Sequence, residues 1–290
     1  MSAVDAGGAN GVGNQAPPLL SIEGLTIDLP TRDRPFRVID GQSLEVPRGG
    51  IVGIVGESGS GKTMLLRAIT GILPEGATRT WSRVAFDGVD VTAAYEKARL
   101  PISMVFQDPM TSFNPLARIG THLVEVARRA GSVSRRETSG AVARNGAGSV
   151  SRREARDLAV AALADARVPD PERVLDRYPH ELSGGLRQRA MIAMSLLAQP
   201  RLLLADEPTT ALDATVQAEI LALLKQLQRE RDLTIVVVTH DLGVVAALCD
   251  TVLVMKDGAI IESGAVDTLF AAPRHPYTRS LLDAAPGGAT

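Results

Sequence analysis

Cysteine is nearly absent from this chain of 290 residues, in which Cys249 is the single example. One cysteine excludes an internal disulfide and a metal cluster built from cysteines, and it fits a reducing compartment. Aromatic residues are also scarce, at 3%, although 45% of the residues are hydrophobic. We therefore expect a sizeable core built mainly from Leu, Val, Ile and Ala, in one large domain or two modest ones.

Long hydrophobic runs are missing as well. No run approaches the ~20 apolar residues that a helix needs to span a bilayer. The first residues also lack the basic stretch followed by an apolar one that is typical of a secretory signal. The formal net charge of −2 gives no overall reason to expect a nucleic-acid partner. Any work at a membrane is therefore expected to take place at its surface.

The most informative stretch is residues 56–63, which match the phosphate-binding pattern G-x-x-x-x-G-K-[ST] without a mismatch. The apolar residues 51–55 before it predict a buried strand, and residues 64–69 after it predict a helix. Glycines let successive backbone N–H groups point at phosphate oxygens, and the helix directs its positive end to the same place. A glycine-rich turn with a chance lysine is the alternative, which the flanking strand and helix disfavour.

The pattern predicts that a continuous set of residues binds a nucleoside triphosphate. Lys62 can reach the β- and γ-phosphates, and the Thr63 hydroxyl can ligate Mg²⁺. The residues predicted to bind this triphosphate are Gly56, Glu57, Ser58, Gly59, Ser60, Gly61, Lys62, Thr63 and Met64.

Two adjacent carboxylates follow the apolar residues 202–205, which predict another buried strand. Asp206 can hold Mg²⁺ opposite Thr63. Glu207, one residue further on, is better placed to polarise the attacking water. An isolated Asp-Glu pair is often a surface turn, but the preceding apolar run disfavours that alternative here.

Two further polar residues close apolar strands that we expect beside the phosphate-loop strand. Gln107 follows residues 102–106 and can ligate the metal or orient water. His240 comes shortly after residues 233–238 and can donate a hydrogen bond to the γ-phosphate. Taken singly, such residues are more often a solvated amide and a structural histidine, so their weight comes from their shared placement.

A second phosphate-binding device lies in residues 182–189. Ser183 can cap the helix that begins there, and two glycines leave its first amides open to an anion. One triphosphate does not need both devices in one chain, so we expect this one to serve a nucleotide held by another subunit. An ordinary capped helix is the alternative. The residues predicted to contact the nucleotide of that other subunit are Ser183, Gly184, Gly185 and Leu186.

The periodicity of the whole chain indicates an α/β fold in which buried strands alternate with helices. Alternating segments predict a small antiparallel sheet from residues 20–29, 36–39, 43–46 and 84–91. An Asp-Gly turn predicts a hairpin over residues 252–261. Helices are predicted between the strand of residues 102–106 and the strand of residues 202–205. They lie near residues 117–130, 151–167 and 184–198.

An internal repeat interrupts the helical stretch. The heptapeptide of residues 131–137, GSVSRRE, recurs at residues 148–154. Because deleting one copy leaves a continuous helix entry, we interpret it as a tandem duplication that forms a solvated loop. Contact of this basic loop with lipid headgroups or nucleic acid is the less favoured alternative.

Together these strings resemble the ATP-binding subunit of an ABC transporter. Residues 56–63 resemble Walker A, residues 202–206 Walker B, Gln107 the Q-loop, residues 182–188 the family signature and His240 the switch histidine. The resemblance implies a P-loop NTPase ABC-type core with an antiparallel β subdomain and a helical subdomain. It also implies a head-to-tail pair of subunits that holds two ATP molecules, with Asp213 of the D-loop at the dimer interface.

Composition, the internal repeat and the resemblance together set the expected domain boundaries. Residues 1–17 are an N-terminal tail without stable structure, and residues 18–270 form the ATPase domain. Within that domain, residues 109–199 form the helical subdomain and residues 131–150 the duplicated insertion. Residues 271–290 form a C-terminal extension.

Finer features are similar to the oligopeptide and dipeptide importer branch of the family. They are residues 107–116, residues 178–185 and the His-Pro-Tyr-Thr string of residues 275–278. The similarity implies an ATPase that powers peptide uptake from the cytoplasmic face of a bacterial membrane. Its implied partners are a different but related ATPase chain, two permease subunits and, indirectly, an extracytoplasmic substrate-binding protein.

Alternatives to peptide import stay open at this point. Importers of nickel, glutathione or opines share much of the pattern, and a soluble ABC ATPase or a regulatory subunit without hydrolysis is a more distant reading. The tail after residue 278 has no cysteine, so no iron–sulfur cluster is implied. The family places an aromatic residue on the adenine, for which Phe36 is the nearest candidate.

Overall fold

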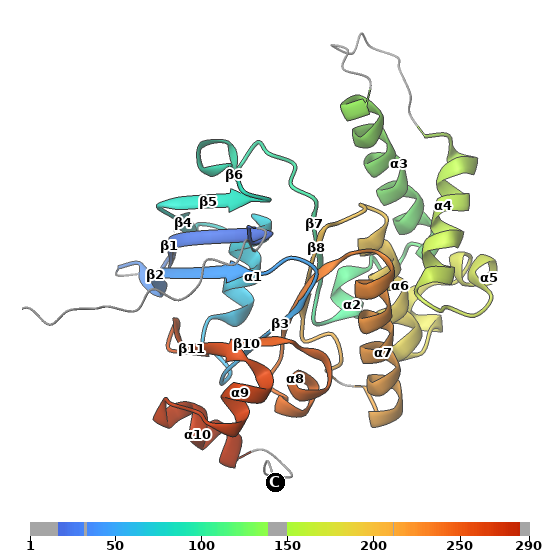
Figure 1. The fold of residues 1–290 in the computed structure, drawn as a ribbon. Helices are drawn as coiled ribbons and strands as arrows, with labels where there is room; N and C mark the ends of the chain where they lie inside the picture. Colours follow the sequence, from blue (N-terminus) through green and yellow to red (C-terminus); the bar gives the residue numbers. More distant parts are fainter. Residues whose placement is uncertain (1–16, 32–33, 139–149, 211, 285–290) are drawn as a thin grey trace, which may run out of the picture.

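The computed structural model describes residues 17–31, 34–138, 150–210 and 212–284, with only the backbone of residues 131–138. Residues 1–16 of the expected tail lie outside the described residues, and so does the middle of the expected insertion. Three parts are visible in Figure 1: an antiparallel sheet, a central parallel sheet and a group of helices. This arrangement confirms the predicted fold class.

The antiparallel sheet forms where the sequence alternates between buried and exposed side chains. β1 and β2 provide its longest pairing, and Gly41 of β2 lies in the left-handed region, with φ 59. The two short strands predicted over residues 36–39 and 43–46 are therefore one continuous strand with irregular register. The strands are β1 (Leu20–Leu29), β2 (Phe36–Val46), β4 (Thr78–Thr80), β5 (Arg83–Phe86) and β6 (Val89–Asp90).

The central sheet has six strands in the order β11-β10-β3-β9-β8-β7, and all but β11 are parallel. Every residue of β3, β8 and β9 is buried, as expected for strands covered on both faces. The carboxyl ends of the parallel strands therefore meet at one edge. The strands are β3 (Ile51–Val55), β7 (Ile102–Val105), β8 (Leu202–Asp206), β9 (Thr234–Val238), β10 (Thr251–Lys256) and β11 (Ala259–Ala265).

The hairpin between β10 and β11 confirms the predicted Asp-Gly turn. Asp257 and Gly258 both have positive φ, at 47 and 79. Two successive left-handed residues are what a type I′ turn requires. A Cβ at Gly258 would lie 1.9 Å from the Val38 carbonyl oxygen, so the turn also needs glycine to approach β2.

Helices cover the central sheet and build the helical group. No helix in the described part of the chain is both long and apolar enough to cross a bilayer. Those of the helical group are α2 (Pro109–Ser112), α3 (Ile119–Thr138), α4 (Arg152–Asp165), α5 (Pro171–Leu175), η2 (Pro179–Glu181) and α6 (Gly184–Leu196). The others are α1 (Lys62–Thr70), η1 (Thr92–Ala94), α7 (Ala214–Glu230), α8 (Leu242–Leu248), α9 (Val266–Ala271) and α10 (Pro276–Asp283).

The two copies of the repeat have different conformations. The first copy continues helix α3 to Thr138, where we expected a loop, because it contains neither proline nor a helix-ending residue after Gly131. The second copy begins α4: Val150 is 2% exposed and packs with Ala127 and Ala155, and Ser151 accepts a hydrogen bond from the Glu154 backbone nitrogen at 3.1 Å. Because the two heptapeptides are identical, their different conformations come from the residues that flank them and from tertiary contacts.

Candidate functional site

The loop after β3 follows a path that only glycine permits. Gly56 has φ 155, and a Cβ there would lie 2.1 Å from the Met255 carbonyl oxygen. Gly61, at φ 97, is the N-cap of α1. The residue that starts the loop and the residue that starts the helix therefore both need the absence of a side chain.

Lys62 is the first residue of α1, and its side chain turns back into this loop. Its ammonium group donates hydrogen bonds to the carbonyl oxygens of Glu57 at 2.7 Å and Gly56 at 2.8 Å, and it lies 3.3 Å from Ser60 Oγ. Burial lowers the pKa of Lys62, while the carboxylates of Glu207, Asp206 and Glu57 oppose that shift. A cation is thus held by backbone carbonyls at the centre of the phosphate-binding loop.

Thr63 and Asp206 face each other across the start of α1 and the end of β8. The Thr63 hydroxyl donates to Asp206 Oδ1 at 3.1 Å. Asp206 is 3% exposed, and burial raises its pKa although the Thr63 hydrogen bond opposes the shift. A buried carboxylate is stabilised by a cation, and hydroxyl and carboxylate oxygens are ligands that Mg²⁺ prefers. These two side chains fit the predicted metal.

Glu207 gathers three polar side chains at the same edge of the sheet. Its Oε2 accepts from Gln107 Nε2 at 3.2 Å and from the Thr210 hydroxyl at 2.7 Å. His240 Nδ1 lies 3.2 Å from its Oε1. The structure therefore brings Gln107, Glu207 and His240 together, although they lie on three segments far apart in the sequence.

The backbone of Glu207 is unusual. Its φ of 44 places a non-glycine residue in the left-handed region, which is uncommon and costs energy. The Glu207 N–H donates to the Val238 carbonyl at 2.9 Å, so the neighbouring strand β9 supports this conformation. The side chain is oriented at the sheet edge by a fixed backbone rather than by a flexible loop.

Thr210 is a member of this cluster that the sequence reasoning missed. It follows Glu207 by three positions, and its backbone N–H bonds to the Glu207 carbonyl at 3.2 Å. A hydroxyl three residues after a candidate base, beyond a proline, is the signal that could have found it.

The predicted signature residues form a separate group. Ser183 caps α6 and accepts from the Leu186 backbone nitrogen at 3.3 Å. Asp213 caps α7 and accepts from the backbone nitrogens of Thr215 at 3.1 Å and Val216 at 3.0 Å. The two caps lie close together, because a Cβ on Gly185 would be 2.6 Å from Val216 Cγ1.

This signature group does not touch the phosphate loop of its own chain. In Figure 1, α6 lies beside α3–α5, while α1 lies across the parallel strands from it. Among the described residues, no hydrogen bond or ion pair joins residues 183–186 or Asp213 to residues 56–63. The two groups of residues predicted to bind phosphate are therefore separate in this chain.

Phe36 begins β2 and pairs with Leu29 in the antiparallel sheet. Its side chain is 61% exposed. Further along the same strand, Ile39 Cγ1 would lie 3.5 Å from a Cβ on Gly61, so β2 does reach the phosphate loop. Contact between Phe36 and an adenine ring stays a prediction.

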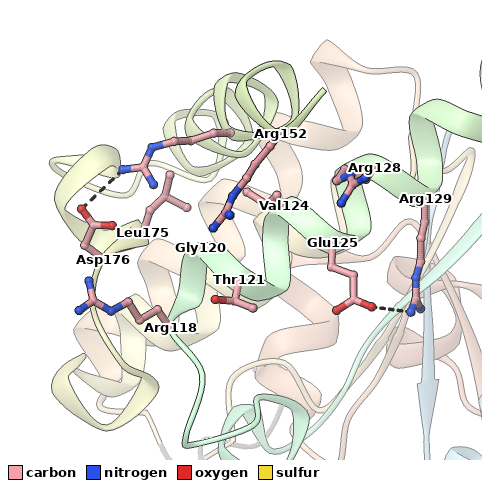
Figure 2. Close-up of a pocket in the computed structure, with 11 residues that line it drawn as sticks. Arg118, Gly120, Thr121, Val124, Glu125, Arg128, Arg129, Arg152, Leu175 and Asp176 are labelled. Atoms are coloured by element: carbon pink, nitrogen blue, oxygen red, sulfur yellow. Dashed lines mark hydrogen bonds and ion pairs between the residues drawn. The ribbon is translucent and has the colours of Figure 1, made fainter. Parts of the chain in front are cut away.

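A cavity of about 780 Å³ lies away from the phosphate loop, between α3, α4 and α5. Arg129 pairs with Glu125, Arg156 Nη2 lies 3.5 Å from Asp176 Oδ2, and Figure 2 shows Arg152 reaching from α4 toward α3. Arginines therefore outnumber carboxylates in its wall. The lining residues are Arg118, Gly120, Thr121, Val124, Glu125, Arg128, Arg129, Arg152, Arg156, Leu175 and Asp176.

Most of the chain is similar to known proteins. A family model described as ABC transporter matches residues 39–210. The chain is 41% identical over 275 residues to the dipeptide transport ATP-binding protein DppD of Escherichia coli (strain K12), covering 92% of this chain and 78% of that protein. It is 42% identical over 275 residues to the oligopeptide transport ATP-binding protein OppD of Bacillus subtilis (strain 168), covering 92% and 72%.

A solved structure shares this architecture. It is the dimeric structure of a post-hydrolysis state of the ATP-binding cassette MJ0796 bound to ADP and Pi. The TM-score is 0.68 at 27% identity, and the match covers 85% of this chain and 98% of that chain.

Proposed function

Because this chain belongs to the ABC transporter family, as one of its ATP-binding subunits, we propose that it hydrolyses ATP to drive the uptake of dipeptides or oligopeptides. The observation that carries the proposal is the convergence of Gln107, Glu207 and His240 beside the phosphate loop, in a chain similar to peptide-transport subunits. Ligand sites at the carboxyl edge of a parallel sheet are the rule in such folds.

Each residue of the first half-site has a role in hydrolysis. Backbone N–H groups of residues 56–64 bind the phosphates, and Lys62 neutralises charge on the β- and γ-phosphates. Glu207 accepts a proton from the attacking water while the water oxygen forms a bond to the γ-phosphorus. The bond between the γ-phosphorus and the bridging oxygen breaks, which gives ADP and phosphate. His240 donates to the γ-phosphate.

The side chains around Glu207 set its direction. Gln107 and Thr210 both donate to Oε2, which leaves Oε1 for water and His240. Mg²⁺, when bound, supplies positive charge to the phosphates, and Thr63, Asp206 and Gln107 are the residues that would hold it. The oxygen donors of these side chains support that assignment.

The second half-site acts on a neighbouring subunit's nucleotide. The α6 N-terminus presents backbone N–H groups and a positive dipole end, which favour a phosphate. These backbone groups belong to residues 183–186, which lie apart from this chain's own phosphate loop. In a head-to-tail pair they would face the ATP that the partner's phosphate loop holds. We propose a different, related ATPase chain as that partner, with Asp213 at the interface.

The arginine-lined cavity supports a contact with the permease. Residues 108–120 run from Gln107 to this cavity, so one continuous segment of the chain would connect a permease loop seated there to the catalytic cluster. The excess of arginine over carboxylate favours an acidic loop. We place the complex at the cytoplasmic face of a bacterial membrane, with two permease subunits and an extracytoplasmic substrate-binding protein.

The decisive experiment purifies the chain with whatever accompanies it from detergent-solubilised membranes and reconstitutes it in proteoliposomes. Peptide import predicts permease subunits in the preparation and ATP-dependent uptake of a labelled dipeptide. Uptake of nickel, glutathione or an opine in place of peptide would replace the substrate class. Recovery of nucleic acid without permease subunits would reject transport.

A charge reversal tests the docking surface separately. Arg152→Glu, which changes the cavity wall, should reduce co-purification with the permease. Arg153→Glu is the matched control, because Arg153 is the next residue of α4 and is absent from the cavity lining. Equal losses in the two variants would remove the cavity from the proposal.

A further inference from the structure

The C-terminal helix α10 contacts the phosphate loop directly. The backbone N–H of Glu57 donates a hydrogen bond to the hydroxyl oxygen of Tyr277 at 3.0 Å, across 220 positions of sequence. Tyr277 is 7% exposed, so its ring is packed rather than resting on the surface. No local sequence signal could have revealed this contact, because its two partners come from opposite halves of the chain.

The backbone N–H and the backbone carbonyl of Glu57 both make hydrogen bonds to side chains. Its N–H is bound by Tyr277, and its carbonyl oxygen accepts from Lys62 Nζ at 2.7 Å. Glu57 therefore connects the Tyr277 hydroxyl to Lys62, the lysine that we assign to the phosphates. A change in the position of the Glu57 backbone would move both the loop and the carbonyl that binds Lys62.

Tyr277 is itself anchored to the central sheet. Glu262 of β11 accepts from the backbone nitrogens of Arg274 at 2.8 Å and His275 at 3.1 Å. His275 Nδ1 accepts from the Tyr277 backbone nitrogen at 3.1 Å and so caps α10. These bonds fix the start of the helix relative to the strands.

The Tyr277 ring is held from a second side. Lys256 Nζ at the end of β10 lies 4.8 Å from the ring centroid, within the range of a cation–π contact. Burial raises the pKa of Tyr277, so the hydroxyl stays protonated near neutral pH. The hydroxyl thus has one fixed place from which to accept the Glu57 hydrogen bond.

We propose that Tyr277 is a positioning residue for ATP binding, which holds the phosphate loop in its binding shape through the Glu57 backbone. Without the hydroxyl the loop samples more conformations, and ATP must pay the cost of ordering it. The proposal depends on ATP binding alone and is independent of which solute is transported.

The test compares hydroxyl deletions on one helix in the full-length chain. Tyr277→Phe keeps the ring and removes the acceptor, and it should weaken ATP binding by about threefold to tenfold, the range of one neutral hydrogen bond. In the reconstituted complex, KM for ATP should rise by the same factor while kcat stays unchanged. Ser280→Ala removes a hydroxyl that donates within α10 to the Tyr277 carbonyl, and it should change neither value.

Amide hydrogen exchange gives a readout that does not depend on activity. Exchange at the Glu57 amide should be faster in Tyr277→Phe than in the unaltered chain or in Ser280→Ala. An unchanged ATP affinity together with unchanged exchange at Glu57 would overturn the proposal. A fall in kcat with unchanged KM would overturn it too, because that pattern assigns Tyr277 to the chemical step.

A second variant keeps the test open if Tyr277→Phe fails to fold. Glu262→Gln weakens the anchor of α10 and leaves the Tyr277 hydroxyl in place. It should accelerate exchange at Glu57 and raise the dissociation constant for ATP. If Glu262→Gln leaves both quantities unchanged, the C-terminal segment does not position the loop.

Discussion

Gln107 donates a hydrogen bond to Oε2 of Glu207 across 3.2 Å, joining residues that lie 100 positions apart. The bond connects the end of β7 to the end of β8. Gln107 also precedes residues 108–120, which run to the arginine-lined cavity. A displacement at the proposed permease contact would therefore reach the side chain that we assign as general base.

Glu207→Gln is the direct test of that assignment. The amide keeps the size of the side chain but accepts a proton poorly, so turnover should fall by about 10²–10⁴-fold. ATP affinity should stay unchanged, because the phosphate loop is not altered. Single-turnover hydrolysis and equilibrium nucleotide binding measure the two effects.

The matched control is Glu230→Gln, at the C-terminal end of α7. Glu230 accepts a hydrogen bond from Gln226 and makes no hydrogen bond or ion pair with the cluster around Glu207 in the described part of the chain. It should behave as the unaltered chain does. Normal turnover in Glu207→Gln would assign the base to another residue.

Gly185→Ala tests the second half-site. A methyl group there would lie 2.6 Å from Val216 Cγ1, so the start of α6 must shift away from α7. A misplaced signature should lower partner-dependent turnover by about tenfold or more, since small misplacements of positioning groups are costly. ATP binding by this chain's own loop should be retained.

Gly184→Ala is the graded control for this prediction. Its methyl group would lie 3.3 Å from Leu212 Cδ2, a contact that a small shift of one side chain relieves. The loss of turnover should therefore be smaller than for Gly185→Ala. The reverse order of effects would show that the contact with α7 does not set the position of the signature.

Local sequence features predicted the elements that need only near neighbours. The alternation over residues 20–29 matches β1, and the apolar residues 51–55 match β3. The cap at Ser183 also forms as predicted, because a cap depends on residues two or three positions away.

Contacts between distant segments could not be predicted in the same way. The Tyr277 hydroxyl meets Glu57 only because α10 returns to the phosphate loop, and no spacing rule relates the two positions. The repeat shows the same limit: the described residues of the two identical heptapeptides differ in conformation, and Val150 of the second copy is buried against Ala127 and Ala155. Tertiary packing overrides local preference in both cases.

Asp87 gives a pH-dependent prediction for stability. It pairs with Arg201 and Arg48, whose hydrogen bonds lower its pKa from 3.8 to about 2. A carboxylate with a depressed pKa in the folded state stabilises the fold above its unfolded pKa, and the contribution is lost as pH falls from about 4 to about 2. Asp87→Asn should therefore destabilise the chain at neutral pH and make little difference near pH 2.

Urea unfolding at several pH values measures this difference. The gap in unfolding free energy between the unaltered chain and Asp87→Asn should be constant above about pH 5 and shrink below it. Arg201→Gln should narrow the gap more than Arg48→Gln, because the Arg201 hydrogen bond is the larger cause of the shift. A gap that is independent of pH would contradict the assigned ion pairs.

Removal of residues 131–147 tests whether the repeat is a neutral insertion. The deletion joins Ala130 to the remaining heptapeptide, so Val150 can still pack with Ala127 and Ser151 can still cap α4. We expect the melting temperature, ATP affinity and turnover to match those of the full chain. Val150→Ala in the shortened chain should instead cost about 1–2 kcal/mol of unfolding free energy, because it empties a buried position. A shortened chain that unfolds at a clearly lower temperature would mean that the extended end of α3 stabilises the helical subdomain.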